Sequence, residues 1–130
     1  MRLLLDTHIF LWYITGDPRL PAPIVPMIRD PANEVYLSVI SVWEVIVKYQ
    51  LGKLFLPQSP DLYLLQQRQK HRIETLSLDE DSVANLGKLP FLHRDPFDRM
   101  LLCQAMRYGL TIVSVDDAVQ AYSGHVLIVP

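Results

Sequence analysis

The sequence has a single cysteine, no long hydrophobic run and almost no excess of charge of either sign, and each shortage excludes a class of protein. Cys103 has no partner within the chain, so a disulfide scaffold is excluded and a reducing cytoplasm is the expected compartment. The longest apolar-rich stretch, residues 35–47, contains two serines and a glutamate and is too short to cross a membrane. Asp6 and His8 interrupt the apolar start of the chain, so no secretion signal is expected and the protein should be soluble.

Composition and charge together describe a globular protein. Half of the 130 residues are hydrophobic and 20% are charged, which excludes disorder and predicts a single domain over residues 1–130. The net charge of −2 argues weakly against a nucleic-acid binder. That average misleads if six acids gather in one pocket, because the other eight then face 12 Lys and Arg and leave a surface charge of +4. These acids are Asp6, Glu44, Asp95, Asp98, Asp116 and Asp117.

Short apolar runs alternate along the chain with segments of helical spacing. We predict strands over residues 2–6, 34–38, 74–78, 111–115 and 126–129. Helices are predicted over residues 9–14, 41–51, 61–72, 79–86, 96–108 and 116–122. A helix over 21–30 is opposed by Pro26 in its middle. The alternation indicates an α/β fold with a mostly parallel sheet and helices on both of its faces.

Four acids lie where such a fold forms its ligand sites. Asp6 ends the first predicted strand and Asp116 follows the strand at 111–115, and ligands bind outside the carboxyl ends of parallel strands. Glu44 and Asp98 each lie three residues after an expected helix N-cap, which is predicted to bring them to the same edge of the sheet.

Each acid also has a purely structural interpretation. Ser41 and Glu44 fit a capping box, and Asp95 followed by proline fits a helix N-cap. The acids at the strand ends could cap the helices that follow them, and Glu44 could pair with Lys48. Four carboxylates at one edge would nevertheless repel one another, by roughly 4 kcal/mol for a pair 4 Å apart at an effective dielectric constant near 20. A bound cation would relieve that repulsion.

The ligand types indicate which cation. Oxygen ligands favour Mg²⁺ or Mn²⁺ over Zn²⁺, and such an ion supports phosphodiester hydrolysis by activating water, with Glu44 the candidate to orient or deprotonate that water. The hydroxyls of Thr7 and Ser114 could hold the acids in place. Arg99, with Arg94 and His93, could contact phosphate, although Arg99 could instead pair with Asp95. We expect His8 to be packed or hydrogen-bonded, Trp43, Tyr49 and Tyr108 to lie in the core, and Cys103 to be a small buried side chain.

Five segments match the pattern of a known family in the right order. They are LLLDTH at 3–8, SVWE at 41–44 followed by Lys48, LGKL at 51–54, HRDPFDRML at 93–101 followed by QA at 104–105, and SVD at 114–116. Together they resemble the PIN-domain ribonucleases of the VapC toxin type, over nearly the whole chain. The segment from 93 to 105 is the most specific part of the match.

The resemblance implies a PIN-like three-layer α/β/α sandwich and a Mg²⁺- or Mn²⁺-dependent endoribonuclease acting on RNA. It further implies the toxin of a toxin–antitoxin pair, a homodimer, and a small antitoxin that lays a C-terminal segment over the acidic cleft. Carried over by position, the family's catalytic and metal-binding acids are Asp6, Glu44, Asp98 and Asp116. The supporting or substrate-binding residues are Thr7, Asp95, Arg99 and Ser114. The Ser-x-Asp spacing favours Asp116 over Asp117 as the last acid.

Three other interpretations remain open. A haloacid-dehalogenase-like, Mg²⁺-dependent phosphatase would need a second aspartate two residues after Asp6, where this chain has His8. A receiver domain would show adjacent acids after its first strand. An inactive PIN-like module that binds RNA or a partner protein would have no reason to keep four mutually repulsive acids.

Overall fold

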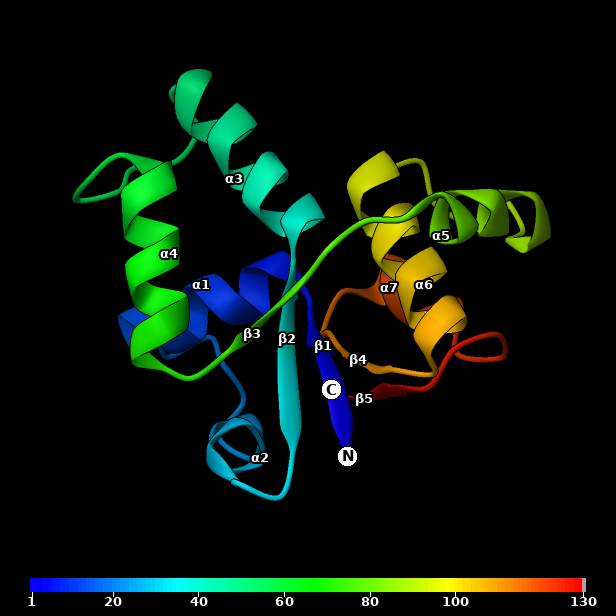
Figure 1. Ribbon diagram of the computed structural model, residues 1–130, viewed down its shortest axis with the longest axis horizontal. Coiled ribbons are helices and arrows are strands. Elements are labelled where there is room, and N and C mark those ends of the chain that lie inside the picture. The colour runs from blue at the N-terminus through cyan, green and yellow to red at the C-terminus, as the bar shows by residue number, and fades with distance from the viewer. Residues whose placement is uncertain (130) are drawn as a thin grey trace.

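The computed structural model describes residues 1–129, which contain five strands, all of them parallel and in one sheet. The order across the sheet is β3-β2-β1-β4-β5 (Figure 1). The strands are β1 (Arg2–Leu5), β2 (Glu34–Ser38), β3 (Glu74–Leu76), β4 (Thr111–Val113) and β5 (Ile128–Val129). In the centre of the sheet, Leu4 pairs with Tyr36 of β2 on one side and with Ile112 of β4 on the other.

Seven α-helices and one 3₁₀ helix connect these strands within the described residues. They are α1 (Thr7–Thr15), α2 (Ile24–Arg29), α3 (Val39–Gln50), α4 (Pro60–Lys70), α5 (Glu80–Ala84), η1 (Asn85–Lys88), α6 (Pro96–Tyr108) and α7 (Asp117–Gln120). Figure 1 shows α1, α2 and α4 on one side of the sheet and α5, α6 and α7 on the other. The predicted α/β sandwich with a parallel sheet is therefore confirmed. Among residues 1–129 no helix is both long and apolar enough to cross a bilayer.

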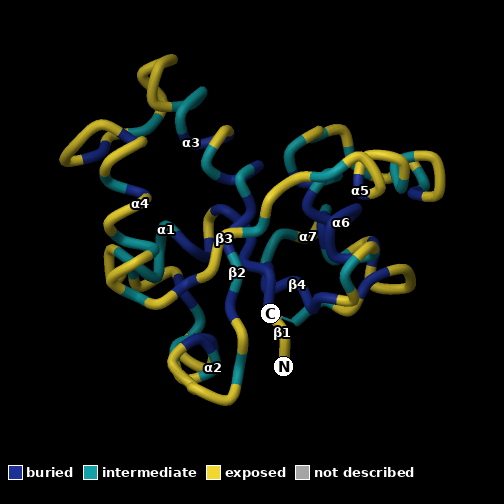
Figure 2. The backbone as a smooth tube through the Cα atoms, viewed as in Figure 1, coloured by how far each residue is buried: buried dark blue, intermediate teal, exposed yellow. Residues whose placement is uncertain are grey.

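The sheet separates two hydrophobic cores. Side chains of successive strand residues point to opposite faces, so Leu3 and Leu5 pack in one core and Leu4 in the other. Ile9 and Phe10 of α1 cover the first face, and Leu102 of α6 covers the second. Figure 2 shows this buried centre surrounded by exposed turns and outer helix faces. A strand with a hydrophobic core on each face needs apolar side chains at every position. This is why the strands appear in the sequence as continuous apolar runs.

The order of the strands creates a cleft position at β1. The chain runs from β1 outward to β2 and β3, then crosses back to β4 on the other side of β1. Such a reversal leaves the carboxyl ends of β1 and β4 free of a direct covering connection, and ligands of open α/β sheets bind there. Asp6 follows β1 and Asp116 follows β4, and both were predicted from the sequence to belong to the site.

Most helix bounds differ from the predicted ones by one to three residues, and the differences at α3 and α2 have a clear physical cause. Helix α3 begins at Val39, because the Ser38 hydroxyl caps it by accepting a hydrogen bond from the Ile40 N–H at 3.0 Å. The predicted Ser41–Glu44 capping box is therefore wrong, and Glu44 lies in the second turn. Pro26 lies inside α2 without breaking it, because it is the third residue of that helix and first-turn N–H groups have no partner within a helix.

Candidate active site

The predicted acids gather at the carboxyl edge of the sheet. Asp6 directly follows β1, and Asp116 lies three residues after the end of the neighbouring β4. Glu44 reaches the same place from α3, and Asp98 from the first turn of α6. Asp6, Glu44 and Asp98 are nearly inaccessible to solvent, with 4%, 2% and 8% of their surfaces exposed.

Asp6 is held by the strand beside it. Its Oδ2 accepts a hydrogen bond of 2.6 Å from the Ser114 hydroxyl, and the Oγ of Ser114 accepts one of 3.1 Å from the Asp116 N–H. Burial raises the pKa of Asp6, the charges of Glu44 and Asp116 raise it further, and the Ser114 hydrogen bond and His8 oppose the shift. The Asp6 side chain does not cap α1, so the capping interpretation is wrong for this acid.

Glu44 has a protein partner on each oxygen. Its Oε1 lies 2.8 Å from the Thr7 hydroxyl, which lies equally close to the Ser41 hydroxyl, and its Oε2 lies 2.6 Å from the Nζ of Lys48. The predicted pairing of Glu44 with Lys48 is thus confirmed. Burial lowers the pKa of Lys48, but the hydrogen bond and charge of Glu44, with the charges of Asp95 and Asp98, outweigh burial and raise it.

Asp98 shows the strongest effect of its surroundings. Burial raises its pKa to about 7, and the charges of Asp6, Asp95 and Glu44 contribute to the increase. The Nε2 of His93, 2.8 Å from Oδ2 of Asp98, opposes the shift. The free energy of keeping Asp98 ionised is therefore unfavourable until a positive charge approaches it.

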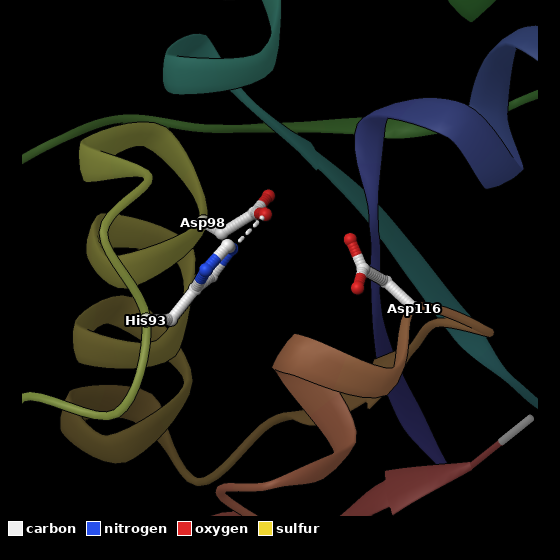
Figure 3. A group of neighbouring side chains, drawn as sticks. All are labelled: His93, Asp98 and Asp116. Atoms are coloured by element: carbon white, nitrogen blue, oxygen red, sulfur yellow. Dashed lines mark hydrogen bonds and ion pairs between the residues drawn. The ribbon is translucent and has the colours of Figure 1, made fainter.

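Asp116 and His93 complete the group. One ligand atom from each of His93, Asp98 and Asp116 lies within 4.8 Å of the others (Figure 3). Asp116 also caps α7, with Oδ1 accepting a hydrogen bond of 2.9 Å from the Ala118 N–H. The sequence suggested His93 only as a phosphate contact. Its position five residues before Asp98 was visible in the sequence, but the loop conformation that turns it toward the acids was not.

The other predicted residues divide between roles. Asp95 caps α6 by accepting hydrogen bonds from the N–H groups of Phe97 and Asp98 at 2.8 and 3.4 Å, as predicted. No ion pair joins Arg99 to Asp95 within residues 1–129; instead Arg99 donates to the Leu89 carbonyl at 3.4 Å, and its guanidinium lies over the Phe91 ring. Asp117 is exposed at the start of α7.

Two aromatic predictions are wrong. Trp43 is 58% exposed and packs edge-on against Phe97, and Tyr49 is also exposed. The buried positions of α3 are 40, 41, 44 and 45, and Trp43 lies on another side of that helix. Cys103 is buried as expected.

The donor set fits a hard divalent cation. Three acids each have one carboxylate oxygen that accepts no hydrogen bond from any described residue, namely Oδ1 of Asp6, Oδ1 of Asp98 and Oδ2 of Asp116. Carboxylate oxygens are the ligands that Mg²⁺ and Mn²⁺ take in proteins. The pKa values of Asp6 and Asp98 are raised mainly by burial and further by the charges of neighbouring acids, so a bound cation would favour their ionised forms. Beside them lies a pocket of about 330 Å³ lined by Asp6, His8, Trp12, Arg19, Val115 and Asp116.

Comparison with known proteins finds relatives in sequence and in fold. The Ribonuclease VapC16 of Mycobacterium tuberculosis is 32% identical over 72 residues, which are 52% of this chain and 51% of that protein, so the chain spans about half the length of this relative. The structure is similar to VapBC2 from Rickettsia felis bound to a promoter DNA fragment, with a TM-score of 0.74, 16% identity, and 99% and 98% of the two chains covered. It is also similar to DNA-bound VapBC from Salmonella typhimurium, with a TM-score of 0.69, 20% identity, and 99% and 97% covered.

The sequence relative bears out the resemblance to a VapC-type ribonuclease, and the two solved structures, at 16% and 20% identity, show a shared fold. The sequence model described as PIN domain matches residues 3–124, which is most of the chain and includes all four acids. This chain therefore belongs to the PIN domain family.

Proposed function

We propose that this chain is a Mg²⁺- or Mn²⁺-dependent endoribonuclease and the toxin of a VapBC-type pair, its residues 1–130 forming one PIN domain. The observation that carries the proposal is the burial of Asp6, Glu44 and Asp98 beside Asp116 at one edge of the sheet. The mutual repulsion of these carboxylates is energetically unfavourable without a cation, and a bound hard divalent ion would offset it. The name of the Mycobacterium tuberculosis relative supports RNA as the substrate.

The carboxylates have separate tasks in this proposal. Asp6, Asp98 and Asp116 would hold the ion through their free oxygens, while Ser114, through its hydrogen bond to Oδ2, fixes the direction of Asp6. When bound, the ion would polarise water and neutralise charge that develops on the phosphate.

Glu44 would act on the attacking water. The hydrogen bonds from Thr7 and Lys48 leave each of its oxygens with lone-pair capacity and keep the side chain fixed, which suits a group that orients water or accepts its proton. Arg19 lines the pocket beside Asp6 and Asp116, where it could contact a phosphate of the RNA.

An antitoxin is the proposed protein partner, with a homodimer in the cytoplasm as the working assembly. Structures of VapBC complexes with this fold support such a partner. Trp43 and Phe91 expose large aromatic surfaces close in sequence to Glu44 and His93, and exposed apolar surface is typical of protein interfaces. Trp43 packs against Phe97 and Phe91 lies under Arg99, so a partner that covers these two aromatic rings would contact residues at the start of α6, the helix that carries Asp98.

The test is cleavage of total RNA by the purified chain with Mn²⁺, with Mg²⁺ and with EDTA. We expect cleavage only with metal, and its loss in Asp6→Asn and Asp98→Asn. Asp117→Asn is the matched control, because Asp117 is an exposed acid next to Asp116 in sequence. Cleavage by Asp98→Asn at the wild-type rate, with metal-independent activity, would contradict the proposal.

A further inference from the structure

We propose that His93 is a nitrogen ligand of the metal site, and that this ligand makes the site prefer Mn²⁺ over Mg²⁺. The inference rests on the proposed function, since it concerns the same ion. It departs from the oxygen-only donor set predicted from the sequence. A site made of the four carboxylates alone would offer only oxygen ligands, and these discriminate little between Mn²⁺ and Mg²⁺.

The first support is the position of the imidazole. The Nε2 of His93 lies 2.8 Å from Oδ2 of Asp98, and ligand atoms of His93, Asp98 and Asp116 all lie within 4.8 Å of one another. Figure 3 shows the ring and both carboxylates turned toward a common space, from the loop before α6, from α6 itself and from the start of α7. The His93 side chain is only 18% exposed, so it belongs to the site rather than to the surface.

The second support is that the loop carrying His93 is fixed by the fold. The fully buried Tyr122 donates its hydroxyl to the Pro90 carbonyl at 2.7 Å and accepts from the Leu92 N–H at 2.9 Å. On the other side of His93, Asp95 caps α6. The loop is thus fixed on both sides of His93, within three residues of it. The imidazole is held near the acids before any ion binds, which lowers the entropic cost of ordering it as a ligand.

The chemistry of imidazole determines the metal preference. A neutral histidine that carries its hydrogen on Nδ1 presents a lone pair at Nε2, so an ion can take the place of the hydrogen now shared between His93 and Asp98. Imidazole is a common ligand of first-row transition ions, whereas Mg²⁺ is bound mainly by carboxylates, carbonyls and water. A nitrogen ligand therefore favours Mn²⁺ more than it favours Mg²⁺.

His8 is the competing nitrogen donor. It lines the pocket beside Asp6 and Asp116, and its charge lowers the pKa of Asp6. It is exposed, however, and its ring lies 5.9 Å from that of Trp12. The described residues show no hydrogen bond between His8 and an acid of the site, so His8→Gln is the matched control for His93→Gln.

The experiment uses the whole chain loaded with Mn²⁺ alone and reads nitrogen coupling by pulsed electron paramagnetic resonance. We expect ¹⁴N coupling in the wild type and in His8→Gln, and its loss in His93→Gln. Calorimetric titration should show the Kd for Mn²⁺ rising about tenfold or more in His93→Gln, with a much smaller rise for Mg²⁺. Glutamine can still donate a hydrogen bond to Asp98, so this variant separates coordination from mere positioning.

Two results would overturn the inference. The first is the absence of ¹⁴N coupling when Mn²⁺ binds the wild type, or coupling that persists in His93→Gln. If the same preparation still cleaves RNA, the nuclease proposal is unaffected by that result. The other is an equal loss of affinity for both ions in His93→Gln, which would assign His93 to holding Asp98. Nitrogen coupling in a protein that cleaves no RNA would support the ligand and contradict only the proposed function.

Discussion

The ammonium group of Lys48 lies 2.6 Å from Oε2 of Glu44, so the least exposed acid of the site has a counter-ion four residues along its own helix. Lys48 is itself partly exposed, and the charges of Asp95 and Asp98 also act on it. A lysine placed in this way stabilises the acids of the metal-free protein, and under the proposed function it would compete with a bound cation.

Replacement of Lys48 tests this relationship. Lys48→Met should lower the free energy of unfolding of the metal-free protein by about 1 to 2 kcal/mol, less than for a fully buried pair because Lys48 is partly exposed. The increase in melting temperature on adding Mn²⁺ should then be larger than in the wild type. Urea unfolding with and without Mn²⁺ measures both effects. Lys53→Met is the control, and an equal loss in both variants would remove the ion pair as the cause.

Asp98→Asn should stabilise the metal-free protein. The substitution removes a buried charge that three other acids oppose, so the free energy of unfolding at pH 8 in EDTA should rise by on the order of 1 kcal/mol. Millimolar Mn²⁺ should raise the melting temperature of the wild type and leave that of the variant nearly unchanged. A wild-type melting curve that ignores Mn²⁺ would contradict the assignment of a metal site.

The raised pKa of Asp98 gives the metal-free protein a defined pH dependence. Below its ordinary pKa of 3.8 the carboxyl is protonated in both the folded and unfolded states, and between 3.8 and about 7 the folded state holds more protons. Stability therefore falls as pH rises through this range, and Asp6 contributes in the same direction. Melting temperatures in EDTA from pH 4 to 8 should fall less steeply in Asp98→Asn. Parallel curves would mean that Asp98 titrates normally.

Tyr122→Phe should loosen the loop that carries His93. Loss of the hydroxyl leaves the Leu92 N–H without its partner, which should cost about 1 to 3 kcal/mol in free energy of unfolding. Affinity for Mn²⁺ should fall as well, because His93 is then less well placed. Tyr63→Phe, at a partly buried position in the other core, is the control for removing a hydroxyl. If Tyr122→Phe is destabilised but binds Mn²⁺ with unchanged affinity, the hydrogen bonds of Tyr122 do not contribute to the metal site.

Local patterns were sufficient to predict most elements of this fold. The run Arg2–Leu5 predicts a central strand because three consecutive leucines suit a strand with a core on each face. Asp95 followed by proline predicts the start of α6, since the cap and the fixed proline dihedral act within a few residues. The start of α3 was misplaced because Ser38 and Ser41 are both chemically suitable caps, and the end of β2 decides between them.

The site was only partly predictable for a related reason. The acids at strand ends could be assigned to one edge, because parallel topology brings carboxyl ends together. His93 could not be assigned, because its direction depends on hydrogen bonds between its loop and Tyr122, which lies about 30 residues further along the chain. Exposure of Trp43 likewise depends on which face of α3 meets the rest of the molecule.

The acids come from both sides of the sheet, with Asp6 leading into the layer of α1 and Asp98 belonging to α6 in the opposite layer. An ion bridging them would therefore tie together two halves that otherwise pack separately against the strands. Amide hydrogen exchange should consequently slow in α1 and α6 together when manganese is added, including at residues far from the bound ion. The bound ion would then also couple local unfolding of one helical layer to local unfolding of the other.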